Sequence, residues 1–472
     1  MIPVFCVYGY TTSTCGDKGN HTGSVGVIQT LNTCDTIQDC TGCSGGGLGG
    51  SHNGTTYGSN NSGPSGGTTP ISSDQIKYEA FKGELSRAAQ DYIAGELALN
   101  TELYNILKQY RFGEEAKEKF SAILNMLGNP FTDLPFAQFE SLVPINEVTL
   151  NRVLAYVIAI PTITIQEASV LTSIETFTGE ILNEEQLSIL RENPLFAQEV
   201  MEALEEGGEV DIEEKVILDP SISSNPKLNC VYNKLKELSS SFFSDVIDNH
   251  FDSAKNAHIM FIVKETPDGE DAFTKGIANG TDYRLFEIQI NPSIIEDSSP
   301  IEIVLLFIHE TIHAELLDRC VRLGLINTFN SEGFPNFTNT PNTFTTYDTI
   351  FALLVNKYKN YYIDHPTDSG ESQWNHDLFT VLNYRENIVE NLLEIHPSLN
   401  DPSDDFLFSV NNDPLNTFGD FNLEDLLNYV SWIGLEGTQE YISSISENPT
   451  ELAKKNYSER AVRNQYTPDC VE

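Results

Sequence analysis

The segment His309-Glu310-Thr311-Ile312-His313 places two imidazoles and a carboxylate at a spacing that suits metal-assisted hydrolysis. Residues four apart share one face of a helix, so His309 and His313 can bind one metal ion. Glu310 lies beside them, where it can act as a general base toward a water molecule. The pattern therefore predicts Zn²⁺ as a cofactor and a hydrolytic reaction.

A buried helix is predicted to carry these residues. Ser299 can cap its start, Pro300 suits the first helical position, and Glu302 completes a capping box. Gly324 suits its C-terminal end, and the almost unbroken apolar run 303–308 is typical of a helix buried on all sides. Two His and one Glu buried there are costly unless a metal ion satisfies them. The alternative is a pair of core histidines bonded to backbone carbonyls.

A catalytic zinc usually takes a third protein ligand and one water. We favour His376, which opens another amphipathic helix that runs to about Ile395, because imidazole suits zinc well. Two alternatives stay open. The third ligand is a carboxylate from that helix, Glu386 or Glu390, or His376 is only an exposed residue near a helix start.

Residues 255–396 resemble the SprT-like zinc peptidases. Those enzymes carry H-E-x-x-H on one helix and a third His in an H-x-x-F element downstream, which is His376-Asp377-Leu378-Phe379 in this chain. The resemblance implies an α+β, zincin-like catalytic domain with a small twisted sheet, zinc bound by His309, His313 and His376, and peptide hydrolysis with Glu310 as base. The chain departs from the family in the long insert 314–375.

Two strands are predicted ahead of the metal-binding helix. Residues 258–263 read as a buried strand, and Phe286, Ile288 and Ile290 alternate with polar residues in a half-exposed one. In zinc peptidases the strand just before the metal helix often forms the sheet edge, to which extended substrate adds by backbone hydrogen bonds. We expect Phe286–Ile290 to be that edge strand. The alternative is an interior strand without substrate contact.

Four further side chains are candidates for supporting roles. Tyr384 is the nearest candidate to stabilise the oxyanion, a role that Tyr often has in such sites, although a core or surface aromatic is the alternative. Glu315, Asp318 and Asp377 can orient imidazole N–H groups, or can be ordinary carboxylates on a helix surface.

Four regions follow from composition and periodicity. Residues 1–71 are a Cys-rich segment with a Gly/Ser-rich linker, expected to be disordered, and 72–215 are mainly helical. Residues 216–400 are the zincin-like peptidase domain, and 401–472 form a C-terminal helical cap. The expected fold is thus α+β, with a mainly α-helical N-terminal region.

The formal net charge of −42 excludes some partners. Such a field repels phosphate backbones, so we exclude nucleic acid and expect a peptide or protein substrate. No apolar stretch reaches the length of a membrane span. A second class of function stays open, in which a non-catalytic acidic surface protein binds a partner and its metal site is structural or degenerate.

Five of the eight cysteines lie within the first 43 residues, ahead of the Gly-rich linker. This arrangement predicts a small disulfide-stapled module and an extracytoplasmic or secreted protein. The alternative is a reduced and disordered segment. The first residues do not form a recognisable signal peptide, and together with the Cys-rich start this leads us to expect a chain that is truncated or misassigned at its N-terminus.

Overall fold

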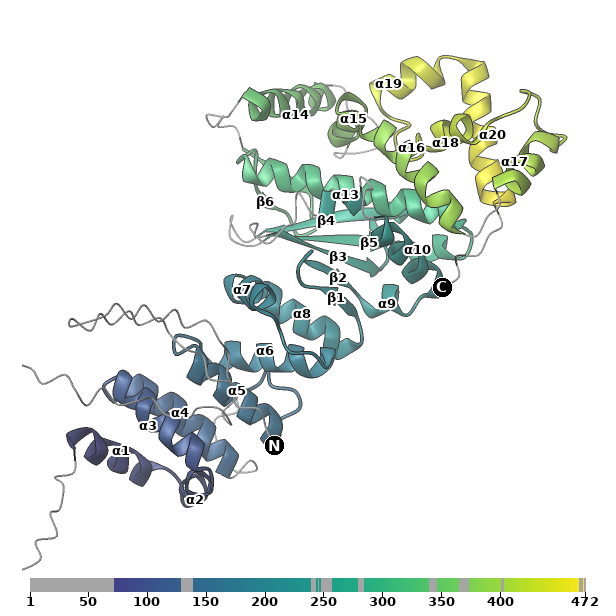
Figure 1. The fold of residues 1–472 in the computed structure, drawn as a ribbon. Helices are drawn as coiled ribbons and strands as arrows, with labels where there is room; N and C mark the ends of the chain where they lie inside the picture. The colour runs from purple at the N-terminus through teal and green to yellow at the C-terminus, as the bar shows by residue number, and fades with distance from the viewer. Residues whose placement is uncertain are drawn as a thin grey trace, which may run out of the picture. The chain divides into compact units, whose positions relative to one another are not determined.

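The computed structural model describes residues 72–128, 139–238, 243–244, 246–247, 257–278, 284–338, 346–364, 373–399, 403–466 and 470. These residues are mostly helical with a small mixed sheet, which confirms the α+β class (Figure 1). The predictions for residues 1–71 lie outside the described residues. The chain divides into two compact units, Met1–Thr176 and Phe177–Glu472. Within the described ranges, no helix is both long and apolar enough to cross a membrane.

The first unit contains only helices among its described residues. Ser72 and Ser86 each accept a hydrogen bond from a backbone N–H in the following turn, so each begins a new helix. Residues 73–109 form three separate helices rather than one continuous helix. The helices are α1 (Ser73–Glu84), α2 (Arg87–Gly95), α3 (Leu97–Gln109), α4 (Glu114–Gly128), α5 (Glu147–Ala159) and α6 (Ile165–Thr178).

The second unit holds the sheet and the motif helix. Its N-terminal part contains α7 (Glu184–Glu192), α8 (Pro194–Glu206), β1 (Glu209–Asp211), β2 (Val216–Leu218), α9 (Pro220–Ser223), α10 (Pro226–Glu237), β3 (Ala257–Val263), β4 (Ala272–Ala278), β5 (Arg284–Ile290) and α12 (Pro292–Ile295). Then follow α13 (Pro300–Arg322), β6 (Ile326–Phe329), β7 (Pro335–Phe337), α14 (Thr346–Asp364), α15 (Gln373–Val381) and α16 (Tyr384–Ile395). The C-terminal helices are α17 (Ser403–Asn412), α18 (Leu423–Val430), α19 (Gln439–Tyr441) and α20 (Pro449–Gln465).

The division between the units falls earlier than the boundary predicted at 215/216. Strand β1 pairs with β2, and β2 pairs with β3, so β1 belongs to the sheet of the second unit. His258 on β3 also packs against Phe196 and bonds to Glu199 of α8. The segment from α7 to β2 begins with two helices, as predicted. Its helix α8 and strand β1, however, contact the sheet of the second unit.

The main sheet has the order β1-β2-β3-β5-β4. Strands β2, β3 and β5 are parallel, and β4 runs antiparallel to β5 at the far edge. Phe286, Ile288 and Ile290 therefore lie in an interior strand, and the prediction that they form the substrate edge is wrong. The alternating pattern of β5 predicts which side chains share a face of the strand. It does not predict which strands lie beside β5, because that depends on pairing with residues distant in the sequence.

Helices cover both faces of this sheet. Successive side chains of a strand point to opposite faces, and on β3 Phe261 packs on Phe307 of α13 while His258 packs on Phe196 of α8. In Figure 1 the motif helix α13 lies along the sheet, with α15 and α16 beyond it. Nearly every residue of α13 is buried, which confirms the predicted buried helix.

The ends of α13 follow the predicted signals. Ser299 accepts a hydrogen bond from the backbone of Glu302, the Glu302 carboxylate accepts one from Ser299 N–H, and Pro300 is the first helical residue. Gly324, just beyond the helix, has a φ of +68°. These local interactions fix where the helix begins, and hence which of its residues face the sheet.

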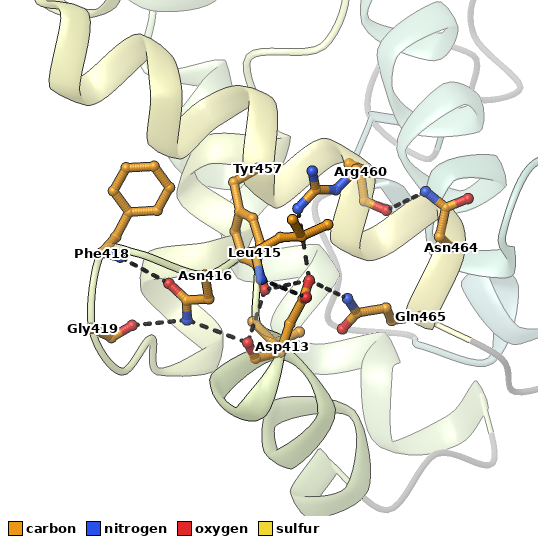
Figure 2. A network of polar contacts seen from close by, with 10 residues as sticks. Asp413, Leu415, Asn416, Phe418, Gly419, Tyr457, Arg460, Asn464 and Gln465 are labelled. Carbon is orange, nitrogen blue, oxygen red and sulfur yellow. Dashed lines mark hydrogen bonds and ion pairs between the residues drawn. The ribbon is translucent and has the colours of Figure 1, made fainter.

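The C-terminal helices pack on α13 and α16 as a cap. Arg463 on α20 donates to Glu302 at 3.0 Å, and Cys230 on α10 forms a disulfide with Cys470. Figure 2 shows a polar network inside this cap, in which the Asp413 carboxylate accepts hydrogen bonds from Leu415 N–H and from Gln465. These contacts hold the last helices to the rest of the second unit.

Candidate metal centre

Three histidine rings from two helices converge on one point. His309 and His313 lie one turn apart on α13, and His376 lies in the first turn of α15. Nε2 of His313 is 3.0 Å from Nε2 of His309 and 3.1 Å from Nε2 of His376. The possible ligand atoms all lie within 4.8 Å of one another, so the three residues could hold a metal ion. The predicted grouping of His376 with the motif is confirmed.

The spacing and the protonation of these rings fit a metal ion. A tetrahedral zinc with Zn–N bonds of about 2.0–2.1 Å separates its nitrogens by roughly 3.3 Å, close to the observed distances. Burial and the neighbouring imidazoles hold the pKa values of His309 and His313 well below their usual range. Burial lowers the pKa of His376 to about 4. The rings are therefore neutral at pH 7, as a metal ligand must be.

The alternative ligands lie elsewhere. Glu386 and Glu390 are both exposed on α16, and Glu386 lies 3.5 Å from the guanidinium of Arg385. Neither carboxylate belongs to the metal-binding group that the described residues form. The helix of His376 also ends sooner than predicted, because Asn383 adopts a left-handed backbone with a φ of +61° between α15 and α16. Glu386 and Glu390 therefore do not continue the helix that carries His376.

Glu310 is placed as the motif predicts, beside the two histidines of α13, and is 6% exposed. Its carboxylate accepts a hydrogen bond of 2.7 Å from the hydroxyl of Thr274 on β4. Burial raises the pKa of Glu310 to about 7. A carboxyl group with a pKa near neutrality can both take and return a proton, and a cation bound next to it favours its ionised form.

Tyr384 was predicted as the oxyanion donor. Its hydroxyl donates a hydrogen bond of 2.7 Å to Glu315, and both side chains are buried. Tyr384 therefore connects α16 to α13, and this contact gives it a structural role. The phenol was predicted as an oxyanion donor only from its position in the sequence, which could not reveal Glu315 as its partner.

Two other predicted supporting carboxylates, Asp318 and Asp377, each accept a hydrogen bond from a group outside the metal centre. Asp318, fully buried, accepts hydrogen bonds of 2.7 Å from Arg284 and from Arg322, and so ties α13 to β5. Asp377 accepts one of 2.9 Å from the backbone N–H of Gln439. Within the described part of the chain, Nδ1 of His313 has no hydrogen-bond partner.

A cavity of about 320 Å³ opens beside the three histidines. Glu310 and the histidines form one side, and the first residues of β4 form another. Its remaining walls are mainly apolar, with Glu270 and Asp271 exposed at the rim. The apolar residues that line it include Phe273, Ile294, Leu305, Leu306, Leu317 and Ile433. This shape suits a chain segment that carries apolar side chains.

Two residues of the site were not predicted. Thr274 lies on β4, whose short sequence is interrupted by Gly276 and carries only a weak strand pattern. Gly434 comes from the C-terminal cap and has a φ of +83°. A Cβ atom at Gly434 would lie 2.9 Å from Cε1 of His309, so the backbone itself touches the ring. No local pattern around residue 434 indicates this contact, which depends on packing between distant segments.

Comparisons with known proteins give no relative for this chain. No family model matches it, and neither a curated protein nor a solved structure shows significant similarity.

Proposed function

We propose that the protein is a zinc-dependent endopeptidase of the zincin type, similar to the SprT-like peptidases. The observation that carries the proposal is the convergence of three neutral imidazoles beside a buried glutamate in a cavity. Three nitrogen ligands with an open fourth position are typical of catalytic zinc, whereas structural zinc sites are closed by four protein ligands.

The residues around the cavity have separate roles in the proposed reaction. His309, His313 and His376 would hold a zinc ion, which would supply Lewis-acid activation of a water and of the substrate carbonyl. The carboxylate of Glu310 takes a proton from the attacking water and gives it to the leaving amine. Thr274 donates to Glu310 and so fixes the direction in which the carboxylate faces the cavity.

Strand β4 replaces β5 as the proposed substrate-binding edge. The C=O of Asp271 accepts from Asn291 on the β5 side, whereas the N–H of Gly276 bonds outward to Gly333. Backbone groups alternate along a strand, so those of Ala272 and Thr274 face away from β5. Both residues line the cavity. An extended peptide can therefore add to this edge next to Glu310.

The disulfide supports an oxidising compartment for the protein. Cys230 and Cys470 have Cα atoms 5.8 Å apart, a separation common for disulfides. Such bonds persist outside the reducing cytosol. We infer that the protein functions outside the cytoplasm or in another oxidising environment.

Metal content measured on purified variants tests the zinc site. We expect one equivalent of zinc in the wild type and less than a tenth of that in His309→Ala, His313→Ala and His376→Ala. His258→Ala is the matched control, because His258 is also buried but contacts α8. Full zinc content in all three site variants would overturn the proposal.

A further inference from the structure

Arg463 is a guanidinium at the cavity that has no role in the reaction proposed above. It comes from α20 of the C-terminal cap, and among the described residues that line the cavity it is the one Lys or Arg. Its Nε donates to Glu302 at 3.0 Å, and its side chain is 57% exposed. Within the described part of the chain, no hydrogen bond to its two Nη atoms is defined. Because all three guanidinium nitrogens carry N–H donors, Arg463 has donors left for a bound molecule.

The Glu302 carboxylate fixes the position of this guanidinium. Glu302 is 8% exposed, and one of its oxygens accepts hydrogen bonds from the N–H and the hydroxyl of Ser299 at 2.8 and 3.0 Å. The other oxygen accepts from Arg463. The capping box thus holds the carboxylate at the first turn of α13, the helix that also carries two of the metal-binding rings. Arg463 is therefore held in a defined place relative to those rings.

Two elements give a similar distance between Arg463 and the metal centre. Its partner Glu302 lies seven residues before His309 on α13, which corresponds to about 10 Å along a helix. The negative charges of Glu302 and then of Asp271 raise the pKa of Arg463, so Asp271 also lies near it. Asp271 lies three residues before Thr274 on β4, again about 10 Å in extended chain. Arg463 is thus about three residues of extended peptide from the reacting bond.

The charges around Arg463 favour a neutral partner for its free donors. Glu270, Asp271 and Glu302 are three carboxylates that line the cavity together with this single guanidinium. Their excess of negative charge disfavours a second anion such as a carboxylate. A main-chain carbonyl oxygen is neutral and accepts hydrogen bonds readily.

We propose that Arg463 is a substrate-binding residue whose Nη groups donate to a main-chain carbonyl oxygen of the peptide, about three residues from the scissile bond. This inference rests on the proposed peptidase function. The contact holds the far end of a peptide that pairs with β4 near Glu310. It recognises the main chain, so it selects peptides long enough to reach Arg463 rather than one particular sequence.

Peptides of increasing length test this contact. A peptide that the wild type cleaves is extended one residue at a time on each side of the scissile bond, and kcat/KM is measured for each length. On one side we expect kcat/KM to rise about tenfold to a hundredfold when the chain gains the carbonyl that reaches Arg463, the usual effect of a hydrogen bond from a charged group. In Arg463→Met, which keeps a long side chain without donors, this rise should vanish while the shorter peptides are cleaved as before.

Arg460→Met is the matched control. Arg460 lies one turn earlier on α20 and pairs with Asp413 inside the cap (Figure 2), so its variant should keep the full dependence on length. Arg463→Lys keeps the positive charge but donates from a single nitrogen, and should keep only part of the rise. Zinc content should be the same in all these proteins.

The outcomes separate the two proposals. If Arg463→Met keeps the rise with length, or lowers kcat/KM equally for short and long peptides, the inference about Arg463 is overturned. It is also overturned if the wild type prefers a free terminal carboxylate to the matching amide and Arg463→Met loses that preference, because the partner is then an anion. In these cases the wild type still cleaves peptides and the peptidase function stands. If the wild type binds zinc but cleaves no peptide of any length, the peptidase function itself fails.

Discussion

Gly434 shows how a single residue outside the motif shapes the metal centre. Its backbone touches the His309 ring, and a Cβ there would lie 2.9 Å from Cε1. His309 and His313 are held only 3.0 Å apart at Nε2. A small displacement of one ring therefore changes the geometry that all three nitrogens offer to an ion.

We predict that Gly434→Ala weakens zinc binding by on the order of ten- to a hundredfold, as outer contacts of metal ligands typically do. Competition with a fluorescent zinc chelator measures the affinity. Gly419→Ala is a matched control, because Gly419 has a similar φ of +91° but nothing within 4 Å of its added Cβ. Equal zinc affinities in the two variants would show that the contact with His309 is unimportant.

Tyr384→Phe separates a structural role from a catalytic one. The variant removes a donor to the buried Glu315, so we expect the free energy of unfolding to drop by about 1–3 kcal/mol. The kcat of the zinc-loaded protein should stay within about threefold of the wild type, since the hydroxyl bonds to Glu315. A hundredfold loss of kcat at unchanged stability would instead return Tyr384 to the oxyanion role.

At the scale of elements, α13 could be predicted because its signals are local. Ser299, Pro300 and Glu302 define its start within four residues, and the spacing of the motif places two imidazoles on one face. His376 was also placed correctly, on the resemblance to a family pattern. The break between α15 and α16 at Asn383 was not predicted. One residue with a left-handed backbone leaves the spacing of the apolar residues nearly unchanged.

The sheet edge could not be predicted from strand patterns. Alternation shows which side chains of Phe286–Ile290 share a face, but it says nothing of the neighbours that pair with the strand. Strand β4 pairs with β5 in an antiparallel hairpin arrangement and takes the edge position instead. The alternation of apolar and polar residues in β4 is weak, and Gly276 interrupts it. A glycine inside a strand often marks a place where another backbone approaches closely.

Ala272→Pro tests β4 as the substrate edge. The N–H of Ala272 faces away from β5, so proline removes a donor to the peptide while the ladder between β4 and β5 remains. We expect KM to rise about three- to tenfold, equivalent to one neutral hydrogen bond. Ala272→Val retains the N–H and serves as control. An unchanged KM in a folded Ala272→Pro protein would exclude this edge.

At the scale of the whole molecule, the sequence indicated an acidic, multi-part chain but not the contacts between its distant segments. Cys230 and Cys470 are separated by 240 residues, and nothing in their local sequences marks them as a pair. Gly434 and Arg463 likewise reach the cavity from the C-terminal cap. The cap was predicted as a region, whereas its part in the site depends on tertiary packing.

Cys470→Ser tests the contribution of this disulfide. A cross-link over 240 residues restricts the unfolded chain strongly, so its loss should lower the free energy of unfolding by about 2–5 kcal/mol. Guanidinium denaturation followed by tryptophan fluorescence measures the change. Wild-type protein in dithiothreitol should unfold like the variant. If the variant unfolds like the oxidised wild type, the disulfide contributes little to stability.

We propose that Glu310 acts as the general base of a zinc peptidase. The most direct test compares the rates at which zinc-loaded wild type and Glu310→Gln cleave a peptide mixture, read by mass spectrometry. The glutamine keeps the shape of the side chain and cannot take a proton, so zinc content should be unchanged while kcat falls about 10²- to 10⁴-fold. Equal cleavage by the two zinc-loaded proteins would contradict the account.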